Sequence, residues 1–316
     1  MAEIKIFYKD NEKIRVAKAI SALKDFDKSD ILWIDLLDVS DITEDALEDF
    51  LKIDIQEDDE MEEIEMSSRY IQTDDSIVIN SNFLKTDFEN VPVNFIMKNN
   101  TLVSVHDVKL DTFTETAKSV TLNSGNYQTG FHVLVSLLET RVRKDADMIE
   151  DLTDMITDIS NKITEGSKEI DDSLLIQIKD LQEKVTIIRQ NSMDKQRVIS
   201  NLLKCNFLPK DLQTRLTMII KDINSLLDYV KFDFDRLDYL QDTFLGLVNI
   251  EQNKIIKIFT VVNIIFLPPT LIASAYGMNF KFMPSLEWHY GNLFAIALML
   301  LSVFITLGIF KIKKWL

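Results

Sequence analysis

The sequence has few residues that bend or cross-link a chain. Its 316 residues include only 7 Gly, 5 Pro and 1 Cys, and so few turn-forming residues favour long helices. The lone Cys205 excludes an intramolecular disulfide and a cysteine-rich zinc site. No GxGxxG, GxxxxGK or HExxH motif occurs, and no nucleophile–base set is recognisable. We therefore expect neither an enzyme nor a nucleotide-dependent pump.

Basic residues are also scarce. The 35 Lys and Arg are outnumbered by 51 Asp and Glu, which gives a formal net charge of −16. A nucleic-acid partner is not expected, because affinity for phosphates depends on basic surface. Divalent cations suit such a chain better. Between positions 54 and 65, eight of twelve residues are acidic and none is basic. This run, which includes Asp58 and Asp59, is either a solvated surface or a low-affinity divalent-cation surface.

Apolar residues are concentrated near the C-terminus. Residues 258–276 and 292–310 are two stretches of 19 residues without a charge, close to the ~20 that a helix needs to cross a hydrocarbon core. Buried core helices are usually shorter and amphipathic. Two such stretches, fifteen residues apart, predict a helical hairpin in a lipid bilayer.

The flanking charges predict the orientation of this hairpin. Basic residues precede the first stretch and follow the second: Lys254, Lys257, Lys311, Lys313 and Lys314. The connecting loop has only Lys281, which Glu287 balances. By the positive-inside rule we expect a multi-pass protein of the cytoplasmic (inner) membrane with both termini in the cytoplasm. The N-terminus has no apolar stretch typical of a secretory signal, which agrees with this expectation.

The cytosolic part begins with an α/β or α+β domain, expected over residues 1–127. A helical pattern covers Thr43–Ile53, with Thr43 as its cap, and Lys98-Asn99-Asn100 predicts a hairpin turn. Strand-like segments are Ile31–Leu37, Ser76–Leu84, Val91–Met97 and Thr101–Val105.

Beyond Gln128 the pattern is entirely helical. Thr129–Ile163 and Ser173–Asn206 predict an antiparallel acidic pair within residues 128–208, and Pro209 opens a third helix. If that helix runs from 210 to 279 it is ~105 Å long, and only an assembly would stabilise such a rod. The expected parts are a stalk (209–257), a first span (258–279), an external loop (280–291), a second span (292–310) and a basic tail (311–316).

The third helix carries a polar stripe that predicts a pore lining. Positions seven residues apart lie on nearly the same side of a helix. One such series consists of Asp228, Asp235, Asp242, Asn249, Ile256, Asn263 and Thr270. A neighbouring series consists of Tyr239, Gly246, Asn253, Thr260, Leu267 and Ser274. Polar groups facing lipid are costly, so this stripe faces protein or water. Packing between helices through Asn, Ser and Thr is the alternative. A ring of subunits around a wet axis accommodates the aspartates, which would repel one another in a dimer.

The end of the first span carries a recognisable motif. Tyr276-Gly277-Met278-Asn279-Phe280, followed by Met283-Pro284, resembles the YGMNF…MP signature of CorA-type magnesium channels. The order of the parts resembles that family over the whole chain. The resemblance implies a funnel-shaped homopentamer whose first span lines the pore. We therefore expect passive conduction of Mg²⁺, and the negative charge of the chain predicts that cytosolic Mg²⁺ controls it.

The resemblance also implies roles for individual residues. Tyr276, Gly277, Met278 and Asn279 match the external selectivity motif, where Asn279 would present its amide oxygen to the water shell of the ion. Mg²⁺ sheds water reluctantly, which suits such outer-sphere binding. Asp228, Asp235 and Asp242 would attract hydrated ions along the axis, and Leu267 and Ile256 are candidates for a hydrophobic constriction. The family's inter-subunit regulatory carboxylates have no clear match in this chain, and Asp222, Asp58 and Asp59 are the candidate substitutes.

Two points leave alternatives open. Ser285 stands where family members often have Glu, which weakens or displaces the external acidic ring. The transported ion could be Co²⁺, Ni²⁺ or Zn²⁺, although Met278 and the all-oxygen ligand set favour Mg²⁺. A hypothesis of another class is a two-span membrane scaffold or signalling protein with a cytosolic coiled coil, but a scaffold has no reason to continue polar residues from stalk to span.

Overall fold

The computed structural model describes residues 2–53, 69–164, 173–278 and 288–313 of the chain. These residues form two compact units, Met1–Gln241 and Asp242–Leu316. The long helix α7 (Lys210–Tyr276) belongs to both units. Each unit is described by itself.

Unit 1 is built on a seven-stranded sheet with the strand order β2-β1-β3-β7-β6-β5-β4. Only β3 and β7 pair in parallel, and every other pair of neighbours is antiparallel. The strands are β1 (Glu3–Asp10), β2 (Lys13–Ala17), β3 (Ile31–Leu37), β4 (Tyr70–Gln72), β5 (Ser76–Leu84), β6 (Asn90–Lys98) and β7 (Thr101–His106).

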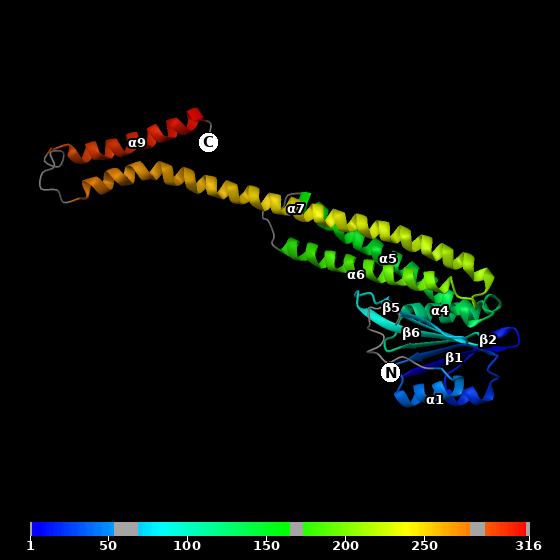
Figure 1. Ribbon diagram of the computed structural model, residues 1–316. Helices are drawn as coiled ribbons and strands as arrows, with labels where there is room; N and C mark the ends of the chain where they lie inside the picture. The colour runs from blue at the N-terminus through cyan, green and yellow to red at the C-terminus, as the bar shows by residue number, and fades with distance from the viewer. Residues whose placement is uncertain (1, 54–68, 165–172, 279–287, 314–316) are drawn as a thin grey trace. The chain divides into compact units, whose positions relative to one another are not determined.

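Helices cover both faces of this sheet (Figure 1). Alternate residues of a strand point to opposite faces, so Trp33 packs in the core beneath α4 (Asp111–Leu122) and α5 (Gly130–Thr164). Its neighbour Ile34 lies on the other face, in the core shared with Leu47 of α1 (Asp41–Leu51). Burial on both faces explains why β3 is apolar except for Asp35, which is itself buried and bonded to Ser104 and His106.

The sequence predicted four of these strands, and the structure confirms them. The hairpin between β6 and β7 is confirmed too, because Asn99 and Asn100 have positive φ angles of 48° and 68°, as a two-residue hairpin turn requires. Short or polar elements were missed: β1, β2, β4, the 3₁₀ helices η1 (Ile20–Asp25) and η2 (Ser124–Asn126), and α4.

The predicted cap of the first helix is wrong. The N-cap residue of α1 is Ser40, which has an extended backbone, and the helix begins at Asp41 rather than Thr43. The backbone N–H groups of Thr43 and Glu44 both donate to the carbonyl of Ser40. Thr43 therefore lies within the first turn, where its hydroxyl is 3.2 Å from that of Ser40.

Three long helices follow in the expected order. α5 (Gly130–Thr164) and α6 (Ser173–Leu202) pack on each other and on the sheet. The 67-residue α7 is about 100 Å long at 1.5 Å per residue. It ends at Tyr276 and continues through Pro268 and Pro269, so the helix enters the apolar stretch without a break.

Unit 2 contains the C-terminal part of α7 and α9 (Gly291–Lys313). Both helices are long and apolar enough to cross a membrane. In the apolar 18-residue segment of α7, no residue is buried within the chain. Such large exposed apolar surfaces are unfavourable in water. Two exposed apolar helices are therefore consistent with the predicted membrane hairpin.

Candidate ion pathway along α7

The polar stripe predicted from the sequence lies on the exposed surface of α7. Every member of the stripe is exposed in the single chain: Asp228, Asp235, Asp242, Asn249, Asn253, Ile256, Thr260, Asn263, Leu267, Thr270 and Ser274. Because one continuous helix carries them, residues seven apart in the stripe lie about 20° apart around its axis, and the stripe winds slowly along α7. The stripe is free to line a path or to contact another subunit.

The hydroxyl groups of the stripe are oriented to suit cations. Thr260 donates to the backbone carbonyl of Ile256 and Thr270 to that of Phe266, both at 2.7 Å. With the proton directed into the helix, the outward side of each hydroxyl oxygen offers lone pairs. Such oxygens accept hydrogen bonds from the water shell of a cation.

Two successive prolines leave the same part of the helix with free acceptors. Pro268 and Pro269 have no N–H to donate to the carbonyls of Ile264 and Ile265, four residues earlier. Within a membrane such carbonyl groups need another partner. Together with the outward Thr oxygens, these carbonyls make the span of α7 rich in acceptors and poor in donors.

At its C-terminal end α7 stops where the recognised motif begins. The N–H of Gly277 donates to the carbonyl of Ala273 at 2.9 Å, and a Cβ on Gly277 would lie 3.3 Å from that same oxygen. Glycine thus allows a close approach of the backbone here. Met278 is 54% exposed and Tyr276 is half-buried.

Asn279 lies outside the described residues, and so do Asp58, Asp59 and the loop with Ser285. Near the C-terminal end of this loop, Trp288 makes edge-on ring contacts with Tyr290 and Phe294, with centroids 6.0 and 6.1 Å apart. Aromatic clusters of this kind are typical of membrane interfaces.

The candidate regulatory residue Asp222 lies in a mixed electrostatic environment. It lines a cavity of about 510 Å³ between α5 and α7 that also contains Glu139, Arg143 and Arg215. Arg215 donates to Glu139 from both Nε and Nη2, at 2.9 and 2.5 Å, and this pairing raises the pKa of the Arg215 guanidinium. A metal ion beside Asp222 of a single chain would thus face two guanidinium groups.

No three His, Cys, Asp or Glu side chains approach one another closely enough to hold a metal ion within residues 2–53, 69–164, 173–278 and 288–313 of one chain. Ion binding by Asp228, Asp235 and Asp242 therefore requires equivalent residues from other subunits or an intact water shell. Both conditions agree with the outer-sphere role that the family resemblance implies.

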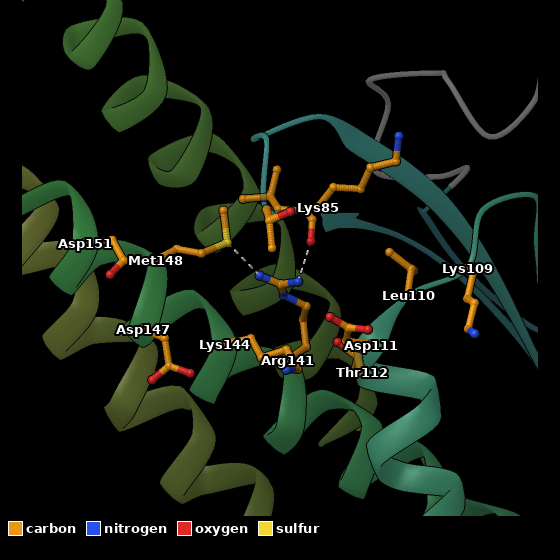
Figure 2. A pocket seen from close by; sticks show the side chains of 12 residues that line it. Lys85, Lys109, Leu110, Asp111, Thr112, Arg141, Lys144, Asp147, Met148 and Asp151 are labelled. Carbon is orange, nitrogen blue, oxygen red and sulfur yellow. Dashed lines mark hydrogen bonds between the residues drawn. The ribbon is translucent and has the colours of Figure 1, made fainter.

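A buried ionic network in unit 1 was not predicted. Lys195 of α6 donates to Asp145 of α5 at 2.8 Å and also to Asn191, while Arg141 donates to Asp145 and to the carbonyl of Leu84 (Figure 2). Lys195, Arg141 and Asp145 are 0%, 2% and 2% exposed. Burial lowers the pKa of Lys195 to about 8, despite the opposing attraction of Asp145. In the sequence, only the i, i+4 spacing of Arg141 and Asp145 points to this network. Exposed ion pairs on helices have the same spacing, so it does not indicate burial.

Comparison with known proteins identifies the family of this chain. The family model described as "CorA-like Mg2+ transporter protein" matches residues 28–314. The chain belongs to the CorA family. The resemblance seen at Tyr276–Phe280 is thereby confirmed at the level of the family.

Relatives in this family cover nearly the whole chain. A magnesium transport protein CorA of Wolinella succinogenes is 38% identical over 296 residues, covering 91% of this chain and 92% of its own length. The CorA protein of Campylobacter jejuni is 35% identical over 299 residues, or 90% and 91% of the two chains. The solved complete structure of the CorA magnesium transporter from Methanocaldococcus jannaschii has a TM-score of 0.80, 22% identity and coverage of 100% and 99%. The CorA fold, with an N-terminal α/β domain, long helices and two C-terminal apolar helices, is therefore that of this chain.

Proposed function

We propose that this chain is the subunit of a homopentameric Mg²⁺ channel of the cytoplasmic membrane, which admits Mg²⁺ passively down its electrochemical gradient. The observation that carries this proposal is the exposed polar stripe of α7, which continues from the acidic part of the helix through its apolar span. Membership of the CorA family supports magnesium as the ion. Both termini lie in the cytoplasm in this proposal, as the flanking lysines indicate.

Several subunits are needed because one helix encloses no path. Around a fivefold axis, Asn253, Thr260 and Asn263 of each α7 would form rings of neutral oxygens, and Leu267 and Ile256 would form apolar rings. Neutral oxygens hold a hydrated ion weakly enough to release it, whereas narrow apolar rings close a pore when they dry. The aspartate rings at Asp228, Asp235 and Asp242 would raise the local cation concentration.

The ligand chemistry favours magnesium over the softer transition metals. The stripe offers amide, hydroxyl and carboxylate oxygens and contains neither His nor Cys, which zinc and nickel sites usually include. Mg²⁺ keeps its water shell and suits oxygens at outer-sphere distance. Co²⁺, which is also octahedral in water, is the strongest competing ion. Competition between Mg²⁺ and Co²⁺ for uptake measures this preference.

Replacing the central asparagine of the stripe tests the pore. We expect Asn263→Leu to reduce Mg²⁺ flux into liposomes at least ten-fold, because an apolar ring at this depth favours a dry pore. Flux is followed with a Mg²⁺-sensitive dye at a fixed membrane potential. Asn263→Ser keeps a polar group and should retain most of the flux.

The control for assembly is native mass spectrometry of both variants in detergent, with five subunits expected in each. The neighbouring substitution Ile264→Leu, which leaves the stripe intact, should conduct as the unchanged protein does. Full flux through Asn263→Leu would show that Asn263 packs against another helix, and a stable monomer or dimer would contradict the pore itself.

The charge of the assembly suggests how the channel is controlled. Five subunits of −16 each bring a formal charge of −80 around one axis (5 × −16), and such repulsion works against a compact form. Mg²⁺ bound between acidic surfaces would relieve it and favour a closed, symmetric state. Low Mg²⁺ would let the stalks separate and the apolar rings wet. The ion thus limits its own entry by binding the closed state more tightly.

We expect Mg²⁺ to protect the cytosolic part from limited proteolysis, with a midpoint of about 10⁻⁴–10⁻³ M, typical of weak oxygen sites. The assay compares MgCl₂ with NaCl at equal ionic strength and follows the fragments by mass spectrometry. Protection by Mg²⁺ alone is the expected result. Equal cleavage in the two salts would mean that the acidic surfaces are merely solvated.

A further inference from the structure

Two exposed flanks border the row of aspartates on α7. At about 100° per residue, Phe232 and Tyr239 lie about 50° to one side of the line through Asp228 and Asp235. Lys231 lies about 50° to the other side of this line. Phe232 is 62% exposed and Tyr239 is 69% exposed, and the other three side chains are exposed too. Phe232 and Tyr239 together are called the aromatic flank.

The aromatic flank lies too far from the membrane to be covered by lipid. Tyr239 precedes the first apolar span, which begins at position 258, by about 19 residues or about 28 Å of helix. The described residues of the chain leave most of both aromatic side chains exposed. Aromatic side chains bury large areas and are enriched at contacts between proteins. Another protein surface is therefore the expected cover.

The series of positions that contains the aromatic flank changes its chemistry along the helix. Residues seven apart differ by about 20° around the axis, so the series of Phe232 and Tyr239 reaches the direction of Asp235 at Asn253. There the series is polar, and it continues with Thr260. The series is thus aromatic where it lies beside the aspartate row and polar where it takes the direction of that row.

Lys231 is the basic residue that remains at the surface of this acidic stretch. Between positions 222 and 253 the only basic residues are Lys231 and Arg236. Arg236 is half-buried and donates to the hydroxyl of Thr157 in α5 at 3.1 Å. Lys231 is exposed, so its ammonium group can reach a neighbouring surface.

A closed ring of five subunits matches the positions of the two flanks. Around a fivefold axis, the neighbours of each subunit lie about 54° to either side of the direction toward the axis. With Asp228 and Asp235 directed toward the axis, the aromatic flank points to one neighbour and Lys231 to the other. Equivalent residues of a ring lie at the same height, so Lys231 of one subunit and Phe232 of the next differ by only about 1.5 Å along the helix.

A twofold pair of chains does not use both flanks. In such a pair the same surface of each copy meets itself, so two aromatic flanks would cover one another and leave Lys231 outside the contact. Contact through the aspartate rows is unfavourable because like charges repel. A head-to-tail contact instead joins an aromatic surface to a basic side chain and keeps the aspartates out of the contact.

We propose that the aromatic flank of each α7 packs against Lys231 of the next subunit, and that this head-to-tail contact directs the aspartate row toward the axis. The ammonium group of Lys231 lies over the ring of Phe232 of the neighbouring subunit, where the ring quadrupole attracts it. The methylene groups of Lys231 cover the rest of the ring. This inference rests on the proposed pentamer and adds the residues that hold its stalk helices side by side.

Disulfide cross-linking of the full-length protein in detergent tests which flanks meet. The background is Cys205→Ala, so that only introduced thiols react, and it should still show five subunits by native mass spectrometry. On oxidation, Lys231→Cys/Phe232→Cys should give a ladder of covalent species that ends at five subunits. Adjacent residues of a helix do not face each other, so a disulfide within one chain is disfavoured. Each single cysteine variant should remain unlinked, because neither flank meets itself in a ring.

A charge reversal tests the same contact without a covalent bond. Phe232→Lys places a second ammonium group opposite Lys231 of the neighbouring subunit and should lower the fraction of pentamer in native mass spectra at least three-fold. Adding Lys231→Glu should restore most of the pentamer, and this rescue acts between chains because adjacent helix residues do not face each other. The matched control Phe207→Lys changes a phenylalanine that is 46% exposed and lies outside α7, and it should assemble as the unchanged protein does.

The outcomes separate this contact from the pore itself. A stable monomer or dimer of the unchanged protein would contradict the proposed function. Five subunits without the cross-linked ladder, covalent dimers from either single cysteine variant, or full assembly of Phe232→Lys would overturn the contact alone.

Discussion

Asn279→Ala should abolish Mg²⁺ uptake while the pentamer still assembles. Among the motif residues Tyr276, Gly277, Met278 and Asn279, only Asn279 has a side-chain amide oxygen to offer the water shell of an arriving ion. The ion keeps that shell because dehydrating Mg²⁺ is costly, so in the proposed channel a ring of these amide oxygens would be the first site that can select it. We expect a loss of at least a hundred-fold in uptake, close to the background of empty liposomes.

The measurement is Mg²⁺ flux into liposomes containing equal amounts of protein, with native mass spectrometry to count subunits. Asn292→Ala is the matched control, because Asn292 is an exposed asparagine in the first turn of α9 and is outside the motif. It should conduct normally. Uptake by well-assembled Asn279→Ala at the unchanged rate would remove the selectivity role from this residue.

The second large effect is expected on stability, at Asp145. This carboxylate is the shared counter-ion of two buried cations, Arg141 and Lys195. Asp145→Asn leaves both without a charged partner, and breaking a buried pair from one side costs about 3–5 kcal/mol. For a unit of this size that corresponds to a fall of about 10 °C in Tm. Thermal unfolding of the full-length protein in detergent, followed by the fluorescence of buried Trp33, measures this fall.

The pH dependence separates an electrostatic cause from a packing defect. In the folded protein burial holds the pKa of Lys195 at about 8, below its ordinary value of 10.5. The unfolded chain therefore binds more protons between these two values, and stability attributable to Lys195 rises with pH across that window. Without Asp145, the pKa of Lys195 falls further and its charge is costlier at neutral pH.

The deficit of Asp145→Asn should accordingly be larger at pH 7 than at pH 9, where Lys195 sheds its proton. The control Asp154→Asn removes an exposed carboxylate from the same helix and should change Tm by no more than about 1 °C. A deficit independent of pH would mean that the charge of Lys195 does not contribute to it, because Arg141 keeps its charge at both pH values.

Several features of this protein could be predicted from the sequence because each rests on a local pattern. The length and apolarity of 258–276 and 292–310 predict spans, since the bilayer sets the length of a spanning helix. The seven-residue spacing from Asp228 to Thr270 predicts a slowly winding stripe, since residues seven apart differ by only about 20° around the axis of an α-helix. The strand β3 was found because burial on both faces leaves a mostly apolar run, Ile31–Leu37, in which Asp35 is the one polar residue.

Elements without such a pattern were missed for physical reasons. In the edge strand β2 only Ile14 is buried, so the strand has no clear apolar pattern. The buried face of α4 includes Thr112 and Thr116, which makes it only weakly apolar. Their structure depends on pairing and packing with distant segments. The cap of α1 was misplaced by three residues because Ser40 and Thr43 are both suitable caps, and only the backbone distinguishes them.

Only the tertiary structure shows which acidic residues are buried counter-ions and which remain exposed. Asp145 and Asp147 are two positions apart on α5 and chemically identical, yet one is buried as the counter-ion of Lys195 and the other is exposed in the lining of a pocket around Arg141 (Figure 2). The sequence predicts an acidic helix at both positions. Which carboxylate is desolvated depends on α6 and on the end of β5, which come from other parts of the chain, and desolvation determines whether a charge stabilises the fold or remains available to a ligand.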